Sequence, residues 1–213
     1  MPVIESKIMI NSKSFKQNEK DHLKLIDEFR GLETKIADAS ARSKAKFDKR
    51  GQLLPRERLK KLLDPGSFWM PLSTLAGYMM GDDDGEKNIG WGNGIGGIGY
   101  VSGVRCLVSV SDSGIKGGSA SEMGMEKGLR GFQIAFENKL PLIQLIESAG
   151  ANLLRQTDMF IKGGRTFANL AKMSAMGLPT IGVVHGSSTA GGAYQTGLSD
   201  YIIVVKNRSK IFL

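Results

Sequence analysis

The sequence predicts an α/β fold, in which helices cover a sheet. Short apolar runs typical of strands alternate with longer segments in which apolar residues recur at helical spacing. The chain has 213 residues, 41% of them hydrophobic, which is enough to build the core of one large domain. The expected strands are IGGIGYV, VRCLVSV, LPLIQLIES, LPTIGVVHG, YIIVV and KIFL. Ser102-Gly103 joins the first two as a two-residue hairpin.

Helices are expected between these strands. They lie in SEMGMEKGLRGFQIAFENK, in GGRTFANLAKMSAMG, and in a short segment that begins at the glycine pair of STAGGAY. The result is a repeated strand–strand–helix order. Crossover helices of this kind pack on the faces of a mostly parallel sheet.

Residues 1–66 are expected to form a helical arm that precedes the main domain, residues 67–213. One amphipathic helix is predicted from Asn18 to Phe47, because apolar residues recur there at spacings of four, three and four, at Leu25, Phe29, Leu32 and Ile36. A second, short helix is predicted in LPRERLKKLLDPGS, where Pro55 suits the first turn.

The net charge of +8 is concentrated in the arm. Residues 1–63 carry sixteen basic and nine acidic side chains, a net of +7. The arm lacks an arginine-rich tract or an RNA-binding signature, so a solvated helix face is the preferred interpretation. An acidic partner or ligand phosphates come second, and no nucleic-acid partner is expected.

The sequence favours a protein of the cytoplasm or an organelle. No apolar stretch has the length of a membrane span, and no basic start is followed by an apolar block. Cys106 is the single cysteine, so it has no partner for a disulfide and is interpreted as a core residue.

Residues 67–99 are interpreted as a long loop rich in glycine, methionine and aspartate. Its consecutive carboxylates, Asp82, Asp83 and Asp84, must point in different directions, whereas calcium loops place their carboxylates at alternate positions. The three aspartates are therefore expected to be solvated turn residues. No metal site is predicted.

The common catalytic patterns are missing. Ser187 and Ser188 follow a strand but lack the G-x-S-x-G of a nucleophile elbow. A Ser113/Lys116 pair has the S-x-x-K spacing, which is too common to argue for peptidase chemistry. The glycine-rich GNGIGG precedes a strand, whereas a dinucleotide loop lies between strand and helix.

Backbone chemistry at two strand ends remains. Small residues follow LPLIQLIES, at Ala149, Gly150 and Ala151, and they follow TIGVVHG, at Ala190, Gly191 and Gly192. Exposed N–H groups at both ends could converge on one oxygen, as in an oxyanion hole. The alternative is that alanine and glycine only let a helix pack close to the sheet. The residues by themselves leave both interpretations open.

Several long motifs then point to a family. From about residue 46 to the end, the chain resembles the carboxyltransferase β-subunits of biotin-dependent acyl-CoA carboxylases. It looks most similar to the β-subunits of methylcrotonyl-CoA and geranyl-CoA carboxylases. The resemblance lies in GQLLPRERLKKLLDPGS, LAGY…GDDDG, SDSGIKGGS, ESAGANLLRQ and HGSSTAGGAYQTGLSDYIIVVKN. It implies a crotonase-like (ClpP/crotonase) ββα superhelix, an α/β fold preceded by an N-terminal helical arm.

The resemblance also implies a reaction. The family transfers a carboxyl group from carboxybiotin to an acyl-CoA, through an enolate whose oxygen is held by backbone N–H groups. By this resemblance the oxyanion hole falls on Gly191 and Gly192. A second donor loop falls on Ala149, Gly150 and Ala151. The implied substrate-binding residues are Lys116, Gly117, Gly118, Ser148, Asn152 and Ala190.

The implied partners are an acyl-CoA, a biotin-carrying α-subunit and other β-subunits in a hexameric core. The expected compartment is the bacterial cytoplasm or the mitochondrial matrix of a eukaryote. The resemblance further implies that the chain is an N-terminal portion, with the biotin side of the site supplied by a partner subunit. Ala149 departs from the pattern, because many relatives have glycine there. Two alternatives stay open: a biotin-dependent decarboxylase carboxyltransferase, and a CoA-binding module without turnover.

Overall fold

The computed structural model describes residues 3–81, 83–89, 94–150 and 156–212. The chain forms two compact units, Met1–Lys35 and Ile36–Leu213. The first contains most of helix α1 (Lys13–Ala41), and the second contains the sheet and the helices that cover it. The Asp82, Ala151 and Asn152 positions singled out in the sequence lie outside the described residues.

The second unit is built on a seven-stranded mixed sheet with the order β1-β2-β3-β4-β5-β6, and β7 pairs with β5. The first three strands are antiparallel, and β3, β4, β5 and β6 are parallel. Their bounds are β1 Met70–Pro71, β2 Gly94–Val101, β3 Val104–Ser111, β4 Leu142–Ser148, β5 Thr180–Thr189, β6 Tyr201–Val204 and β7 Lys210–Phe212. Because β3, β4 and β5 run in the same direction, their carboxyl ends meet at one edge of the sheet.

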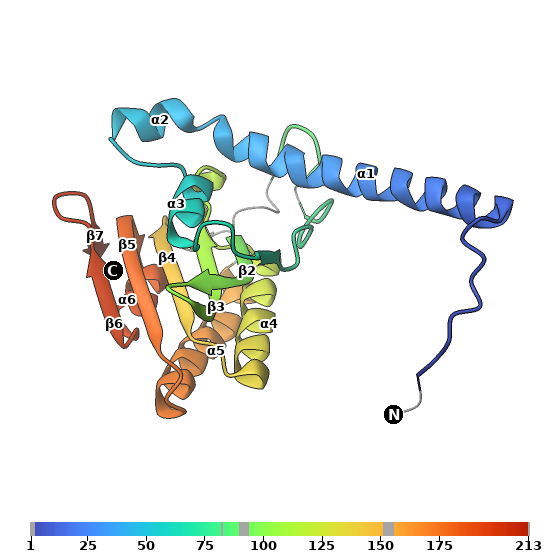
Figure 1. Cartoon of the computed structure of the whole chain (residues 1–213). Helices are drawn as coiled ribbons and strands as arrows, with labels where there is room; N and C mark the ends of the chain where they lie inside the picture. The colour runs from blue at the N-terminus through green and yellow to red at the C-terminus, as the bar shows by residue number, and fades with distance from the viewer. Residues whose placement is uncertain (1–2, 82, 90–93, 151–155, 213) are drawn as a thin grey trace. The chain divides into compact units, whose positions relative to one another are not determined.

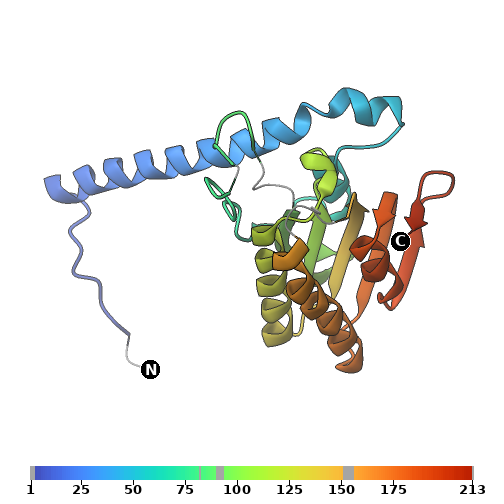
Figure 2. The same cartoon turned by 180° about the vertical axis from the view of Figure 1, so that it is seen from behind.

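Helices cover the sheet on both faces. Helices α4 (Glu122–Asn138), α5 (Gln156–Ala175) and α6 (Gly191–Gly197) lie on one face, behind the strands in Figure 1 and in front of them in Figure 2. The short α3 (Pro55–Leu62) packs on the other face through Leu59. The expected helix in 163–177 is present, but α5 begins earlier, at Gln156.

The alternating side chains of β3 and β4 divide the core between these two faces. The α4/α5 side holds Leu107, Phe132, Ala135, Leu140, Leu142, Leu170, Met173 and Leu178. The α3 side holds Leu59, Ile95, Cys106, Val108, Val110, Ile143 and Leu145. Cys106 is buried, as the sequence predicts for a core residue.

The predicted hairpin between β2 and β3 is confirmed. Val101 pairs with Val104, and the two turn residues, Ser102 and Gly103, both have positive φ, 51° and 76°. Such a turn matches the twist of the flanking strands. The Asp64 carboxylate accepts hydrogen bonds from both turn N–H groups, each at 2.7 Å, and so holds the turn from the end of α3.

The prediction of one helix from 18 to 47 is wrong. Helix α1 ends at Ala41, and a separate α2 (Lys44–Lys49) follows. The break coincides with two hydrogen bonds to the turn after β3. The Ser40 hydroxyl donates to Asp112 at 2.6 Å, and the Ser43 hydroxyl donates to the Gly114 carbonyl at 2.8 Å. These bonds fix the chain where the helical pattern would otherwise have continued.

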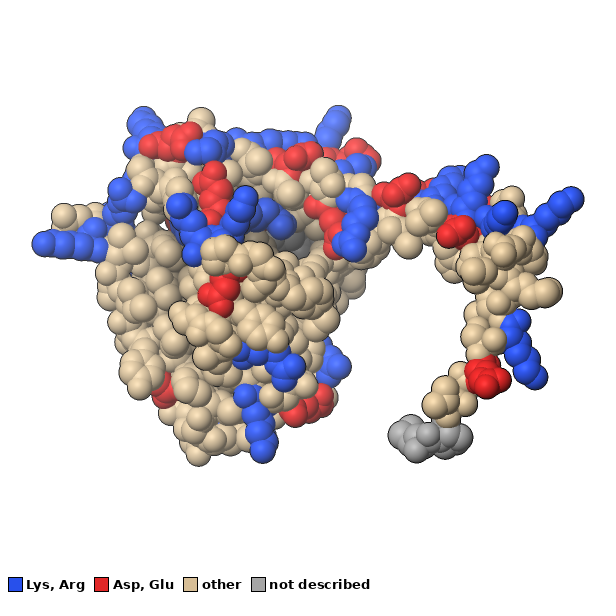
Figure 3. Space-filling view, in the orientation of Figure 1, with Lys and Arg blue, Asp and Glu red and all other residues tan. Residues whose placement is uncertain are grey.

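The basic arm has the features of a solvated helix. Lys and Arg alternate with Asp and Glu along α1 in Figure 3, and ion pairs form one helical turn apart, as between Arg30 and Glu33. The expected apolar stripe is largely open in the first unit, where Leu25 is 61% and Phe29 is 40% exposed. No helix in the described ranges is long and apolar enough to cross a membrane.

The aspartates of the 67–99 segment are only partly as expected. Asp84 is exposed, and its carboxylate accepts hydrogen bonds from the N–H groups of Glu86, Lys87 and Asn88, which lower its pKa. Asp83, in contrast, is buried and accepts hydrogen bonds from Met79 and Gly85. The interpretation of Asp83 as a solvated residue is therefore wrong. It stabilises its turn from inside.

Candidate active site

The two glycine-containing strand ends open into one cavity of about 630 Å³ between the sheet and helices α4, α5 and α6. Gly150 follows β4, and Gly191 and Gly192 begin α6 directly after β5. All three line the cavity, as do Gly118, Ser148 and Ala190. A Cβ atom built on Gly150 would lie 3.8 Å from the Ala190 Cβ, so the two strand ends touch.

The glycines of the pair have different surroundings. A Cβ on Gly191 would lie 3.7 Å from the Phe167 ring, an ordinary contact. A Cβ on Gly192 would lie 3.1 Å from Ser188 Oγ and 3.2 Å from Ser148 Cβ, tighter than side chains normally pack. Gly192 therefore also serves the close packing of helix on sheet. The first N–H groups of a helix have no intrahelical acceptor, so both glycines can present a donor.

Ala190 holds the glycine pair in place through an unusual backbone. Its φ is 48° and its ψ is −113°, a conformation that a residue with a side chain adopts at a cost of about 1–3 kcal/mol. Two backbone hydrogen bonds support it. The Ala190 N–H donates to the Phe212 carbonyl at 3.0 Å, and its carbonyl accepts from the Tyr194 N–H at 3.2 Å.

The second predicted donor loop is arranged differently from the first. The Gly150 N–H donates to Ser148 Oγ at 3.1 Å, so this N–H already has an acceptor. The Gly150 carbonyl accepts from the Ala120 N–H at 3.0 Å, which fixes the loop against the start of α4. A donor role for Ala149, Gly150 and Ala151 stays a prediction.

The Lys116–Gly118 segment forms a single turn of 3-10 helix beside this loop. A Cβ on Gly118 would lie 2.5 Å from the Glu147 carbonyl oxygen, so no other residue fits there without a shift of the backbone. A Cβ on Gly117 would lie 3.6 Å from the Ala149 Cβ. Gly118 lines the cavity, and the expected substrate contacts of Lys116 and Gly117 stay predictions.

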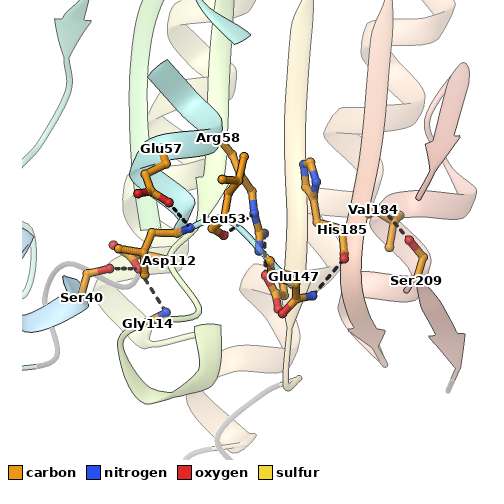
Figure 4. Close-up of polar contacts among 12 residues, drawn as sticks. Ser40, Leu53, Glu57, Arg58, Asp112, Gly114, Glu147, Val184, His185 and Ser209 are labelled. Carbon is orange, nitrogen blue, oxygen red and sulfur yellow. Dashed lines mark hydrogen bonds and ion pairs between the residues drawn. The ribbon is translucent and has the colours of Figure 1, made fainter. Parts of the chain in front are cut away.

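An ion pair beneath the end of β4 was not expected from the sequence. Arg58 of α3 donates from Nη1 to Glu147 Oε2 at 2.5 Å, and the two side chains are 5% and 8% exposed. Arg58 Nε also donates to the Leu53 carbonyl at 2.9 Å, and the guanidinium lies over the Phe47 ring. Figure 4 shows Arg58 reaching Glu147 next to His185 on the neighbouring strand. Glu147 directly precedes Ser148, so the pair holds the end of β4.

His185 belongs to the same polar cluster. Its carbonyl accepts a hydrogen bond from Gln52 Nε2 at 3.1 Å, and its ring Nε2 is buried without a hydrogen-bond partner in the described structure. Burial, together with the positive charge of Arg58, lowers the pKa of His185 to about 4, and Glu147 only partly opposes this. The native state therefore holds the imidazole neutral.

This gives an expected acid dependence of stability. The folded pKa of about 4 lies below the ordinary value of 6.5, so the unfolded chain binds a proton more readily. Stability is then lost as pH falls from about 6.5 towards 4, by at most about 1.4 kcal/mol per pH unit, and by less because the ring is partly exposed. Urea unfolding at several pH values should show this slope. His185→Gln, which has no imidazole to protonate, should flatten it. An unchanged slope in His185→Gln would exclude this explanation.

A second buried carboxylate, Asp112, fixes the chain after β3. It is fully buried, and its Oδ1 accepts from Ser40 at 2.6 Å and from the Gly114 N–H at 3.2 Å. Burial raises its pKa, and Arg56, with Nε 3.8 Å from Oδ2, opposes that effect. The contacts hold the turn that leads into the Lys116–Gly118 segment.

No three His, Cys, Asp or Glu side chains lie together as metal ligands in the part of the chain that the structure describes. The cavity instead offers backbone N–H groups, a few hydroxyls and an apolar wall. The wall is formed by Met125, Phe132, Leu142, Ile146, Met159 and Phe167. This composition suits an acyl chain with one polar end.

Comparison with known proteins identifies the family. The carboxyl transferase domain family matches residues 46–213. The chain is 47% identical over 164 residues to a probable biotin-dependent acyl-coenzyme A carboxylase beta2 subunit of Mycobacterium tuberculosis, covering 77% of the chain and 30% of the relative. It is 40% identical to a probable mitochondrial methylcrotonoyl-CoA carboxylase beta chain of Drosophila melanogaster, covering 99% of the chain and 37% of the relative.

A solved structure is consistent with this family. The geranyl-CoA carboxylase beta subunit of P. aeruginosa superimposes with a TM-score of 0.89 at 53% identity, covering all of this chain and 40% of that one. The chain thus spans between 30 and 40% of the length of these relatives. The crotonase-like α/β fold expected from the motifs is confirmed. The chain belongs to the carboxyl transferase domain family of the biotin-dependent acyl-CoA carboxylases.

Proposed function

We propose that the chain is the acyl-CoA-binding half of a carboxyltransferase that carboxylates an acyl-CoA in a biotin-dependent carboxylase. One observation carries the proposal: the ends of β4 and β5 open into a single apolar cavity, with the glycine pair at its wall. An acyl chain in this cavity would bring its thioester carbonyl to the start of α6. The N–H groups of Gly191 and Gly192 would then hold the oxygen as it gains negative charge on deprotonation of the acyl group.

The energetic contribution of such donors is large. A backbone N–H that is already positioned for a developing oxyanion contributes roughly 3 to 4 kcal/mol to transition-state stabilisation. Ala190 keeps the donors in position through its two backbone hydrogen bonds. No ionised side chain has to move for the oxygen to be stabilised, which suits a thioester enolate.

The cavity walls leave room for a branched or extended acyl group. Helix α4 presents Gly124, Gly128 and Gly131 to the cavity, and α5 presents Gly163. Side chains at these positions would narrow the cavity, so the glycines leave room beyond the thioester. A branched unsaturated acyl-CoA, such as 3-methylcrotonyl-CoA or the longer geranyl-CoA, fits this space.

We assign the binding of biotin to a partner subunit. When bound, carboxybiotin supplies the carboxyl group. Its polar ureido ring requires several hydrogen-bond partners, whereas the described wall is mainly apolar. The cavity therefore fits the acyl group better than it fits biotin. We infer that a biotin-carrying α-subunit and further β-subunits complete the site, in the bacterial cytoplasm or the mitochondrial matrix.

Isothermal calorimetry tests the acyl-CoA site. We expect 3-methylcrotonyl-CoA and geranyl-CoA to bind more tightly than free CoA, because only the thioesters fill the cavity. Gly128→Leu should weaken geranyl-CoA binding by about tenfold, since the added side chain occupies the cavity. Gly164→Leu is the matched control: Gly164 is also a helical glycine with open space around it, but it lies outside the cavity lining. Equal affinity for free CoA and both thioesters would contradict the proposal.

A further inference from the structure

Lys127 is a charged side chain in the cavity wall that the proposed reaction does not yet use. It lies on α4, and its Nζ donates to the Gly94 carbonyl at 2.8 Å. A Cβ built on Gly96 would lie 3.6 Å from Lys127 Cε, so the aliphatic part of the lysine side chain packs against the glycine backbone of β2. Among the described lining residues, Lys127 alone carries a charge.

The topology places this ammonium group at the edge of the sheet that carries the donor loops. Gly94 pairs with Ser111, the last residue of β3. The carboxyl ends of β3, β4 and β5 form that edge, and the glycine pair follows β5. Neighbouring strands lie about 4.8 Å apart, so the Lys127 anchor on β2 is about 10 Å from the end of β4. A Cβ on Gly192 would lie 3.2 Å from Ser148 Cβ, so the glycine pair is at this end of β4. A carboxylate about 5 Å from a thioester carbon, with a hydrogen bond of about 3 Å at each end, spans that distance.

The electrostatics of this corner favour an anion. Burial, and secondarily the charge of Arg56, lowers the pKa of Lys127 to about 8. Arg56 Nε is buried and donates no hydrogen bond in the described structure. The positive charge of Arg56 thus acts on Lys127, and the carboxylate of Asp112 lies 3.8 Å from Arg56 Nε. A negative ligand group would relieve the cost of holding the ammonium in an apolar wall.

We propose that Lys127 binds the carboxylate that the reaction adds to the acyl group. This assignment rests on the proposed function. The substrate acyl group is uncharged, and its carboxylated product carries an anion that an apolar cavity cannot hold without a partner. The ammonium group has three donors, one of which goes to the Gly94 carbonyl, so it can hold a carboxylate while it stays anchored. Lys127 is then a product-recognition residue in the wall of the same cavity as the glycine pair.

The test compares two thioesters that differ by one carboxylate. These are 3-methylcrotonyl-CoA and 3-methylglutaconyl-CoA, and each is titrated by calorimetry into the wild-type chain and into Lys127→Met. We expect the substitution to weaken binding of the carboxylated thioester by about tenfold or more, because a hydrogen bond to a charged group is lost. Binding of the uncharged thioester should change less than twofold. Lys127→Arg, which keeps the charge, should recover part of the loss.

The controls separate this assignment from a structural role. Arg130→Met removes an exposed cation from the same helix and should leave both affinities unchanged. Equal weakening of both thioesters by Lys127→Met, with a lower melting temperature, would mean that the lysine only supports the wall and would overturn the assignment. Failure of both thioesters to bind the wild-type chain would overturn the proposed function, and this assignment with it.

Discussion

Replacement of Gly191 by proline is expected to lower the turnover of the assembled carboxylase by about a hundredfold to a thousandfold. Proline removes the N–H group, and the loss of one positioned donor to an oxyanion has an effect of this size. The first position of a helix is where proline is best tolerated, because its N–H has no intrahelical acceptor there. The loss should appear in kcat more than in KM, since the donor acts mainly when the oxygen becomes charged.

Gly191→Ala is the matched control for this experiment. It also adds bulk at this position, next to the Phe167 ring, but it keeps the N–H group. We expect alanine to retain most of the turnover per folded enzyme. Gly192 is less suited to the test, because any side chain there meets Ser188 and Ser148 and would disturb folding and catalysis together. Equal turnover in the proline and alanine variants would show that the Gly191 N–H does not hold the oxygen.

Arg58→Met is expected to destabilise the sheet-containing unit by about 3–5 kcal/mol. The substitution leaves the Glu147 carboxylate buried without its partner, and breaking a buried ion pair from one side has a cost of this size. The double variant Arg58→Met/Glu147→Leu removes both charges and should recover much of the loss. Urea unfolding followed by circular dichroism gives the four free energies of this cycle.

An exposed ion pair provides the comparison. Lys44 and Asp48 are paired on the surface of α2, and Lys44→Met should cost less than about 1 kcal/mol. If Arg58→Met cost no more than Lys44→Met, the Arg58–Glu147 pair would not be a structural support of the β4 end. The buried pair should also influence turnover, because Glu147 directly precedes the loop at Ser148 and Gly150.

The strands and the main helices could be predicted because their signals are local. The apolar runs of β4 and β5, the Ser102-Gly103 turn and the helical spacing of α4 each depend on residues close together in sequence. The end of α1 could not be found in this way. It is set by hydrogen bonds from Ser40 and Ser43 to a turn about seventy residues further on.

The residues of the candidate site also differ in whether their signal in the sequence is local. Gly191 and Gly192 were singled out because small residues after a strand are a local pattern, and they line the same cavity as Gly150. Glu147 did leave a signal, a carboxylate at the end of the apolar run LIQLIES, but its partner Arg58 is distant in sequence. Lys127 left no signal in the sequence, because a lysine on an amphipathic helix normally faces water. Only the fold turns it towards the cavity.

The polar cluster beneath the end of β4 also bears on how quickly the chain folds. Arg58 and Glu147 are 89 residues apart, and Gln52 and His185 are 133 residues apart. Contacts of such long range form late, because the entropy of closing a large loop must be overcome before the contact stabilises anything. The parallel pairing of β4 with β5 adds to this delay. We therefore expect α4 and the β2–β3 hairpin to form early, and the polar cluster of Gln52, Arg58, Glu147 and His185 to be among the last features to appear during folding.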